Sequence, residues 1–246
     1  MPMTRNRRCT PVLASVFALL FAVLIAGCEP VEWQATAPEV NSGTPAVDSA
    51  LAVAQTLTVK GRAPKTGYSR DEFGPAWKDT DGNGCDQRND ILNRDLTNIM
   101  HKPGTGGCVV LAGTLKDPFS DKTINFERGQ KTSHKVQIDH VVALSDAWQK
   151  GAQQWDASKR VRFANDPLNL LAVDGPLNAQ KGDGDAATWL PPNKAFRCQY
   201  VARLVGVKHS YSLWVTQAEQ DAMVRVLNSC PDEPVPTEES APYDEP

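Results

Sequence analysis

The sequence lacks several patterns that would assign a biochemical class at once. It contains no Cys-x-x-Cys pair, so a zinc site built on paired thiolates is poorly supported. It contains no Gly-x-Ser-x-Gly motif, the turn that presents a nucleophilic serine, which argues against a Ser-His-Asp hydrolase. Nothing in it resembles a zinc finger or a helix-turn-helix, so base-specific reading of DNA is not expected.

A strong excess of charge of one sign is also missing from the central part of the chain. The formal net charge of the whole chain is −3. Between Gly61 and Cys230, however, 22 Lys and Arg residues stand against 19 Asp and Glu residues, a net charge of +3. The residues after Cys230 include six acidic and no basic side chains. The central part is therefore mildly basic, which permits a polyanionic substrate without requiring one.

The one long apolar run lies near the N-terminus and is too short for a full membrane span. Residues 12–26 are nearly all apolar and follow a stretch with three arginines, as in a signal peptide. The run ends in Ile-Ala-Gly-Cys, which resembles a bacterial lipobox and implies cleavage before Cys28 and lipidation of its thiol. An ordinary signal peptide with a chance cysteine is the alternative. We expect an exported protein, lipid-anchored to the outer face of the bacterial cell membrane or extracellular if released.

Cysteine usage agrees with export, because four cysteines remain after the signal segment. These are Cys85, Cys108, Cys198 and Cys230. Four cysteines in an exported domain suggest two disulfides, which can connect in three ways. We favour the two local pairings, Cys85 with Cys108 and Cys198 with Cys230.

Composition divides the chain into four segments. Residues 1–28 form the lipoprotein signal peptide, and residues 29–59, rich in Ala, Pro, Thr, Val and Ser, are expected to be a flexible tether. One folded domain is expected over residues 60–230. Residues 231–246 are acidic and rich in proline, and we expect them to be disordered.

Apolar periodicity within the domain indicates an α+β fold that is rich in helix and has little sheet. Helices are predicted over residues 90–100, 144–154, 177–181 and 217–227, the last with Thr216 as its N-cap. Strands are predicted over residues 109–115 and 136–142, and residues 169–173 form a further short apolar run before Gly175-Pro176.

Four polar residues around these strands have the side chains that phosphodiester hydrolysis requires. The reaction needs an activated water and a charge sink for the pentacoordinate phosphate. A neutral imidazole is a suitable base near neutral pH, and His140 supplies one. Carboxylate and amide oxygens suit Mg²⁺, and Asp139 and Asn178 supply them. Asn169 is expected to fix the imidazole, because the partner of one ring nitrogen decides which nitrogen faces the water.

Three sequence blocks carry a resemblance to a known family. DHVVAL (139–144), NDPLNLLAV (165–173) and NAQKGD (178–183) resemble the HNH (ββα-metal) endonuclease motif in its Asp-His/Asn/Asn form. A related arrangement occurs in the HNH domain of RNA-guided CRISPR nucleases. The domain as a whole, about residues 60–230, resembles exported bacterial HNH proteins related to the C-terminal nuclease domain of GmrSD-type restriction enzymes.

The resemblance implies a ββα-metal core elaborated with additional helices and stapled by disulfides. It places the general base on His140 and the metal ligands on Asp139 and Asn178. The sequence departs from the family pattern in lacking Cys-x-x-Cys braces and in the long separation of His140 from Asn169. Neither departure removes a reacting group. Each of these residues alone has a structural alternative, and the ordered set favours the catalytic interpretation.

Four basic residues are candidates for substrate binding: Arg88, Lys181, Arg160 and Arg162. The segments GYSRDEFGPAW (67–77) and NGCDQRNDIL (83–92) also resemble the exported family. Arg88 lies in the second, and we hypothesise that it contacts a phosphate. Lys181 would share a helical face with Asn178, so it either contacts a phosphate or is a solvated lysine. Arg160 and Arg162 either extend a basic groove or are simple surface charges.

An acidic segment offers a competing interpretation. Residues 79–90 (DTDGNGCDQRND) have oxygen-bearing side chains at alternate positions and Gly at the sixth, close to an EF-hand calcium loop. The twelfth position is Asp rather than Glu, and no good helix precedes the loop. The alternative to an enzyme is therefore a non-catalytic calcium-binding surface lipoprotein with a degenerate nuclease fold. A different hydrolase acting on a smaller ester is a second alternative.

We favour an exported, metal-dependent HNH endonuclease with little sequence specificity. Its expected substrate is nucleic acid, DNA in preference to RNA, and its expected cofactor is a divalent ion, Mg²⁺ before Mn²⁺ or Ca²⁺. Contact with the membrane is expected only through the lipid anchor, and the sequence indicates no protein partner.

Overall fold

The computed structural model describes residues 49–236 of the chain. The predicted signal peptide, Cys28 and most of the predicted tether lie outside the described residues, as do residues 237–246. The described part is α+β, as expected, and within it no helix combines the length and the apolar character needed to span a bilayer.

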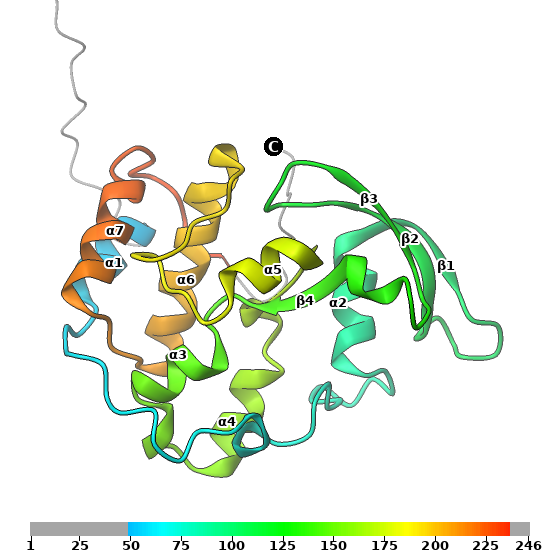
Figure 1. Cartoon of the computed structure of the whole chain (residues 1–246), viewed down its shortest axis with the longest axis horizontal. Helices are drawn as coiled ribbons and strands as arrows, with labels where there is room; N and C mark the ends of the chain where they lie inside the picture. The colour runs from blue at the N-terminus through cyan, green and yellow to red at the C-terminus, as the bar shows by residue number, and fades with distance from the viewer. Residues whose placement is uncertain (1–48, 237–246) are drawn as a thin grey trace, which may run out of the picture. The chain divides into compact units, whose positions relative to one another are not determined.

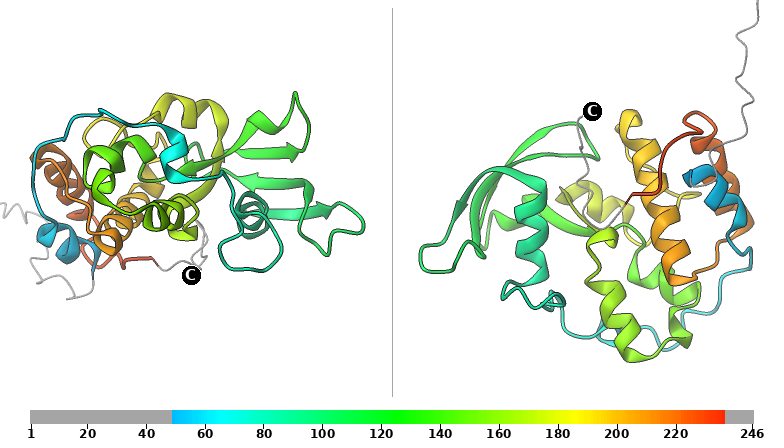
Figure 2. Two further views of the ribbon diagram at one scale, coloured as in Figure 1. Left: turned by 90° about the horizontal axis from the view of Figure 1, so that it is seen from below. Right: turned by 180° about the vertical axis from the view of Figure 1, so that it is seen from behind.

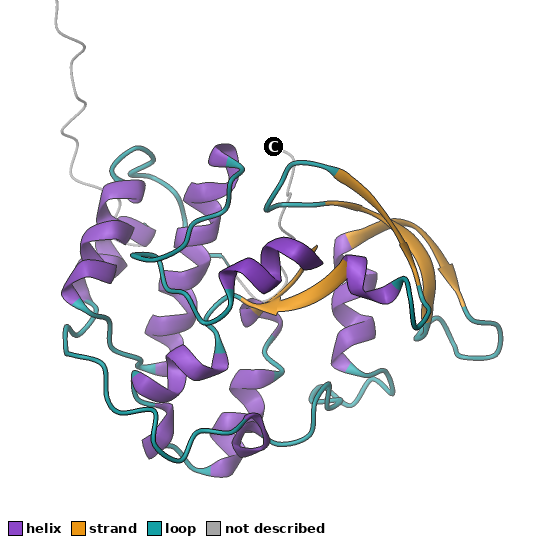
Figure 3. Cartoon of the chain, in the orientation of Figure 1, coloured by secondary structure: helices purple, strands orange, loops and turns teal. Residues whose placement is uncertain are grey.

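Two small antiparallel sheets make up the strand structure (Figure 3). The first has the order β1-β2-β3 and consists of β1 (Leu96–His101), β2 (Val110–Lys116) and β3 (Thr123–Glu127). The second pairs β4 (Val136–His140) with β5 (Leu170–Asp174), so that Asp139 lies opposite Leu171 and His140 opposite Leu170.

The described residues form seven helices (Figure 1). They are α1 (Ala50–Thr56), α2 (Gln87–Asp95), α3 (Leu144–Gln149), α4 (Ala157–Ala164), α5 (Gly175–Lys181), α6 (Arg197–Tyr211) and α7 (Gln217–Leu227). Of these, α5 and α2 contact the β4–β5 pair, and α1, α3, α4, α6 and α7 lie to one side of it. Short 3-10 turns occupy Arg70–Phe73, Ser133–Lys135, Ala152–Gln154, Pro167–Asn169 and Lys194–Phe196. The predicted helix over 144–154 is split at Gly151, whose φ is +131°.

The β4–β5 pair separates two hydrophobic clusters. Along β5, Leu171 and Val173 pack into a large cluster with α1, α3, α6 and α7, whereas Leu170 and Ala172 pack into a smaller one with α2 and the first sheet. Successive side chains of a strand point to opposite faces, so a strand with apolar neighbours on both sides is apolar throughout. Burial on both faces of β5 therefore explains why the run 169–173 does not alternate between apolar and polar residues.

The predicted boundaries of the folded domain were wrong at both ends. Residues 49–57 are not a tether: Ser49 caps α1, and Ala50, Leu51, Ala54 and Leu57 are buried. Figure 2 shows α1 beside α6 and α7. The backbone of Ala50 also donates to the carbonyl of Glu233, so residues 231–236 belong to the fold as well. The apolar spacing of this short helix is hidden within an Ala- and Val-rich segment.

The predicted helix over residues 90–100 was wrong in its second half. Helix α2 begins at Gln87, capped by Asp86, and ends at Asp95. Residues 96–101 form strand β1 instead, with Leu96 paired to Leu115 of β2. Helix-like spacing at Leu96 and Ile99 could not reveal this pairing, because the spacing within one segment does not show which other segment it pairs with.

Two other predictions are confirmed. The disulfides are Cys85–Cys108 and Cys198–Cys230, the favoured local pairings. Helix α7 spans the predicted residues, and Thr216 and Glu219 form a reciprocal capping box at its start.

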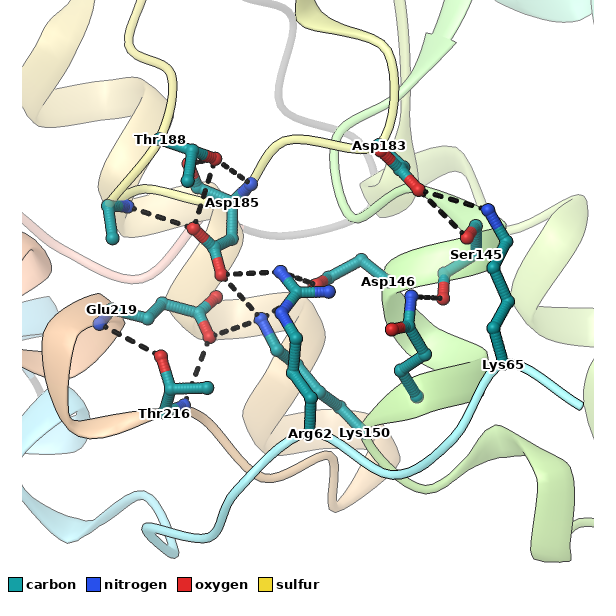
Figure 4. A network of polar contacts seen from close by, with 12 residues as sticks. Arg62, Lys65, Ser145, Asp146, Lys150, Asp183, Asp185, Thr188, Thr216 and Glu219 are labelled. Carbon is teal, nitrogen blue, oxygen red and sulfur yellow. Dashed lines mark hydrogen bonds and ion pairs between the residues drawn. The ribbon is translucent and has the colours of Figure 1, made fainter.

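A buried cluster of charges joins α3, α6 and α7 to the loop that follows α5 (Figure 4). Three cations and three anions form this ion cluster: Arg62, Lys150, Lys208, Asp146, Asp185 and Glu219. Lys150 Nζ lies 2.9 Å from Asp185 Oδ2 and 2.6 Å from Glu219 Oε2. Because the charges are balanced and close together, the cluster fixes the loop after α5 against the helical layer.

Candidate active site

Helix α5 lies directly on β4, and this contact assembles the candidate site (Figure 1). Strand β5 ends at Asp174, whose carboxylate accepts from Leu177 N and starts α5 at once. A Cβ at Gly175 would collide with the backbone oxygen of His134, so only glycine permits this close approach. On the facing strand, Gln137 Oε1 accepts a hydrogen bond from Asn178 Nδ2 at 2.9 Å.

His140 is the last residue of β4, and its imidazole is held by a backbone carbonyl. Its Nε2 lies 2.9 Å from the oxygen of Ala164. A carbonyl oxygen can only accept, so the proton belongs on Nε2 and Nδ1 is left as the basic nitrogen. Burial lowers the pKa of His140 to about 4, aided by the charges of Arg70 and Lys181 and opposed by the Ala164 hydrogen bond. The imidazole is therefore neutral at pH 7, as a general base must be.

Asn169 does not hold the imidazole, which corrects the expectation from the sequence. Its Oδ1 accepts from Val142 N at 2.8 Å, and its Nδ2 donates to the carbonyls of Val142 and Phe163. The Asn169 amide thus fixes the backbone that follows His140, while Ala164 orients the ring. Sequence spacing could not distinguish these roles, because Ala164 contributes only a main-chain atom.

Asp139 is buried, and only one of its two carboxylate oxygens has a hydrogen-bond partner among the described residues. Its Oδ1 accepts from Lys181 Nζ at 2.8 Å, and the same ammonium donates to the His140 carbonyl at 2.7 Å. Burial raises the pKa of Asp139, and the charge and hydrogen bond of Lys181 counteract this rise. Asp139 Oδ2 has no hydrogen-bond partner in the described part of the chain.

Lys181 is therefore neither a solvated lysine nor a free phosphate contact, as the sequence had suggested. It is 3% exposed, and its ammonium is bonded to Asp139 and to the backbone of β4. Lys181 and Asn178 do lie on one helix, as predicted, but Lys181 points toward β4 and not toward solvent.

A cavity of about 280 Å³ lies between β4 and α5, and its walls contain three of the predicted reacting residues. Asp139, His140 and Asn178 all border it. Two arginines border it as well: Arg88 from α2, half-buried, and Arg70, exposed. The Asp139 carboxylate, the Asn178 amide and the His140 imidazole thus border one cavity, together with two arginines.

The remaining predicted basic residues lie elsewhere. Arg160 donates to the backbone of Glu72 and pairs with its carboxylate, and Arg162 is exposed on α4 and hydrogen-bonded to Ser158. Neither borders the cavity at His140. The basic groove expected from Arg160 and Arg162 is not formed at this site.

Two residues at the site were missed by the sequence reasoning: Arg70 and Trp77. The Trp77 ring lies parallel to the His140 imidazole, with 6.2 Å between centroids and 17° between planes. Both residues lie in the block GYSRDEFGPAW (67–77), which carried part of the family resemblance. The signal was present, but no spacing rule connects this block to a strand some 60 residues later.

In the acidic loop over residues 79–90, Asn83 Nδ2 donates to both Asp81 and Asp90, but no three carboxylates of this loop come within ligand distance of one point. Asp79 accepts instead from the backbone N–H groups of Gly82 and Gly84. Among residues 49–236, one grouping of three potential metal-binding side chains occurs, Cys198, Cys230 and Glu233, and its thiols form a disulfide. The Cys85–Cys108 disulfide fastens this loop, and calcium binding by it stays a prediction.

A strand pair followed at once by a helix, with Asp, His and Asn facing one cavity, defines a nuclease-like site of the ββα kind. The family model of the GmrSD restriction endonucleases, C-terminal domain, matches residues 86–226. The chain belongs to this family. It is also 38% identical over 188 residues to an uncharacterized secreted protein of Arthroderma benhamiae, a match that covers 76% of this chain and 87% of the relative. No solved structure matches the chain.

Proposed function

We propose that the protein is an exported, metal-dependent endonuclease that hydrolyses phosphodiester bonds of nucleic acid, DNA in preference to RNA. The observation that supports this most directly is the shared cavity of Asp139, His140 and Asn178. Membership of a restriction-endonuclease domain family points to the same chemistry.

The residues at the cavity fit a divalent ion. Asp139 Oδ2 is a buried carboxylate oxygen without a hydrogen-bond partner among the described residues, and leaving such an atom unsatisfied is costly. Asn178 donates with its Nδ2 to Gln137, which leaves its Oδ1 as an acceptor. Hard oxygen donors of this kind suit Mg²⁺, with Mn²⁺ and Ca²⁺ as alternatives. A bound ion would neutralise the charge that develops on the phosphate.

His140 acts as the general base in this proposal. Its Nε2 is committed to Ala164, so Nδ1 takes the proton from the attacking water. Asn169 and Lys181 act indirectly: Asn169 fixes the chain after His140, and Lys181 holds one oxygen of Asp139. Arg88 and Arg70 border the same cavity and would contact the phosphate oxygens.

Export is supported by two observations. The two disulfides fit an oxidising compartment, where disulfides persist. The Arthroderma benhamiae relative is named as a secreted protein. Lipidation of Cys28 remains a proposal that rests on the sequence pattern around that residue.

Plasmid digestion tests the proposal. The wild-type chain is expected to cut plasmid DNA in the presence of Mg²⁺, to stop in EDTA, and to recover when Mg²⁺ or Mn²⁺ is restored. His140→Ala should lose at least a hundredfold in rate, because general-base catalysis contributes about 10²–10⁴-fold. His209→Ala, an exposed histidine on α6, is the matched control and should cut as the wild type does. Undiminished cutting by His140→Ala would overturn the mechanism.

A further inference from the structure

A second cavity, of about 260 Å³, lies on the other side of His140. Four residues border both cavities and so form the wall between them: Arg70, Trp77, His140 and Leu144. The second cavity is far larger than one ordered water requires. It is less polar than the first cavity, because aromatic and aliphatic side chains make up a larger share of its walls. These include Phe73, Pro75, Ala76 and Ala164.

One polar side chain of the second cavity is buried and incompletely bonded. Asn165 is 1% exposed, and its Nδ2 donates to the Val161 carbonyl at 2.9 Å. Its Oδ1 has no hydrogen-bond partner among residues 49–236. An acceptor left unsatisfied in this way is costly, and a hydrogen bond from a ligand N–H group would remove that cost. The cavity therefore combines aromatic and aliphatic surfaces with polar groups, among them Asn165 and Asp71.

The wall between the two cavities carries a cation and a strained aromatic residue. Arg70 is exposed and forms no ion pair in the described part of the chain. Trp77 has φ +58°, a left-handed conformation that is strained for a large L-residue. Strain of this kind is retained where the surroundings hold a residue in place, and here it sets the indole parallel to the imidazole.

We propose that the second cavity is a subsite for one nucleobase of the substrate, next to the scissile phosphate. This inference rests on the proposed phosphodiester chemistry, which places the phosphate in the first cavity beside His140. The base would contact Trp77, and its amino group would donate to Asn165 Oδ1. Arg70 would contact the phosphate at the junction. A base seated there is unstacked from its neighbours, so the site favours single-stranded over duplex nucleic acid.

Calorimetric titration with mononucleotides tests the subsite without requiring cleavage. Adenosine 5′-monophosphate and adenosine 3′-monophosphate are each compared with the matching ribose phosphate, with and without Mg²⁺. Base stacking contributes about 1–3 kcal/mol per base, so at least one nucleotide should bind about tenfold more tightly than its base-free counterpart. Equal affinities in both pairs would overturn the proposal.

Filling the cavity provides the matched variants. Ala76 is exposed at the cavity rim, so Ala76→Trp should fill the cavity without disturbing the core. It should reduce nucleotide affinity to that of the ribose phosphate and leave ribose phosphate binding unchanged. Ala218→Trp, on the exposed side of α7, is the control and should bind as the wild type does. Circular dichroism checks folding, and Ala76→Leu supplies a smaller obstruction with a smaller expected loss.

The two proposals can fail separately. A chain that binds the nucleotide with the stated preference but cuts no phosphodiester keeps the subsite and contradicts the nuclease assignment. A chain that cuts nucleic acid but binds neither nucleotide better than ribose phosphate, or whose nucleotide affinity survives Ala76→Trp, contradicts the subsite alone.

Discussion

Lys181 and Asp139 form a buried ion pair, with 2.8 Å between Nζ and Oδ1. The pair joins the helix of the candidate site to its strand, because Lys181 ends α5 and Asp139 lies on β4. Lys181 also donates to the backbone of His140, so one ammonium positions both the proposed metal-binding carboxylate and the proposed base.

Lys181→Met is expected to destabilise the fold by about 3–5 kcal/mol, because it leaves a carboxylate buried without its partner. Urea denaturation measures this loss. The double variant Lys181→Met/Asp139→Asn should recover a large part of it, since neither charge then remains unpaired. If the double variant were as unstable as the sum of the two single variants, the pairing would not explain the stability.

Gly175→Ala should separate α5 from β4. The added Cβ meets the backbone oxygen of His134, which cannot move as a flexible side chain can. We expect a loss of about 1–3 kcal/mol in the free energy of unfolding, together with a loss of nuclease activity. Gly61→Ala is the control, because a Cβ there meets nothing and the backbone is unstrained. Equal stability of the two variants would contradict this account of the helix–strand contact.

The ion cluster predicts a loss of stability in acid. Burial alone would raise the pKa of Asp185, but Lys150 and Arg62 outweigh it and lower that pKa from 3.8 to about 2. A carboxyl whose pKa is lower in the folded state stabilises the fold at pH values above its unfolded pKa. This contribution, roughly 2 kcal/mol, is lost as the pH falls from about 4 through about 2.

Thermal unfolding between pH 6 and pH 2 measures this dependence. Asp185→Asn should lower the melting temperature at pH 6 and flatten its dependence on pH below 4. Asp232→Asn, which lies outside the ion cluster, is the control and should keep the wild-type profile. A wild-type melting temperature that stayed constant from pH 5 to pH 2 would contradict the assignment.

The predictable part of the fold is the part whose signals are local. Thr216 and Glu219 mark the start of α7 within four residues, and the alternating then apolar run before Asp139-His140 marks β4. The family blocks predicted that Asp139, His140 and Asn178 share one site. The first two inferences used residues close together in the sequence, and the third used the order of the family blocks.

The remainder depends on contacts between separate segments of the chain. Leu96 is in a strand because Leu115 pairs with it. Helix α1 is part of the fold because it packs against α6 and α7 and its first residue bonds to the Glu233 carbonyl. The inward direction of Lys181 depends on Asp139, and the role of Asn169 depends on where the backbone of Val142 turns. Local periodicity contains none of this information.

The central claim is that Asp139 and Asn178 bind one divalent ion beside His140. An anomalous difference map from crystals soaked in Mn²⁺ tests it most directly. The account predicts one strong peak bonded to side-chain oxygens of both residues, which disappears in Asp139→Ala crystals. A map at saturating Mn²⁺ with no peak in that cavity, or with its strongest peak elsewhere, would contradict it.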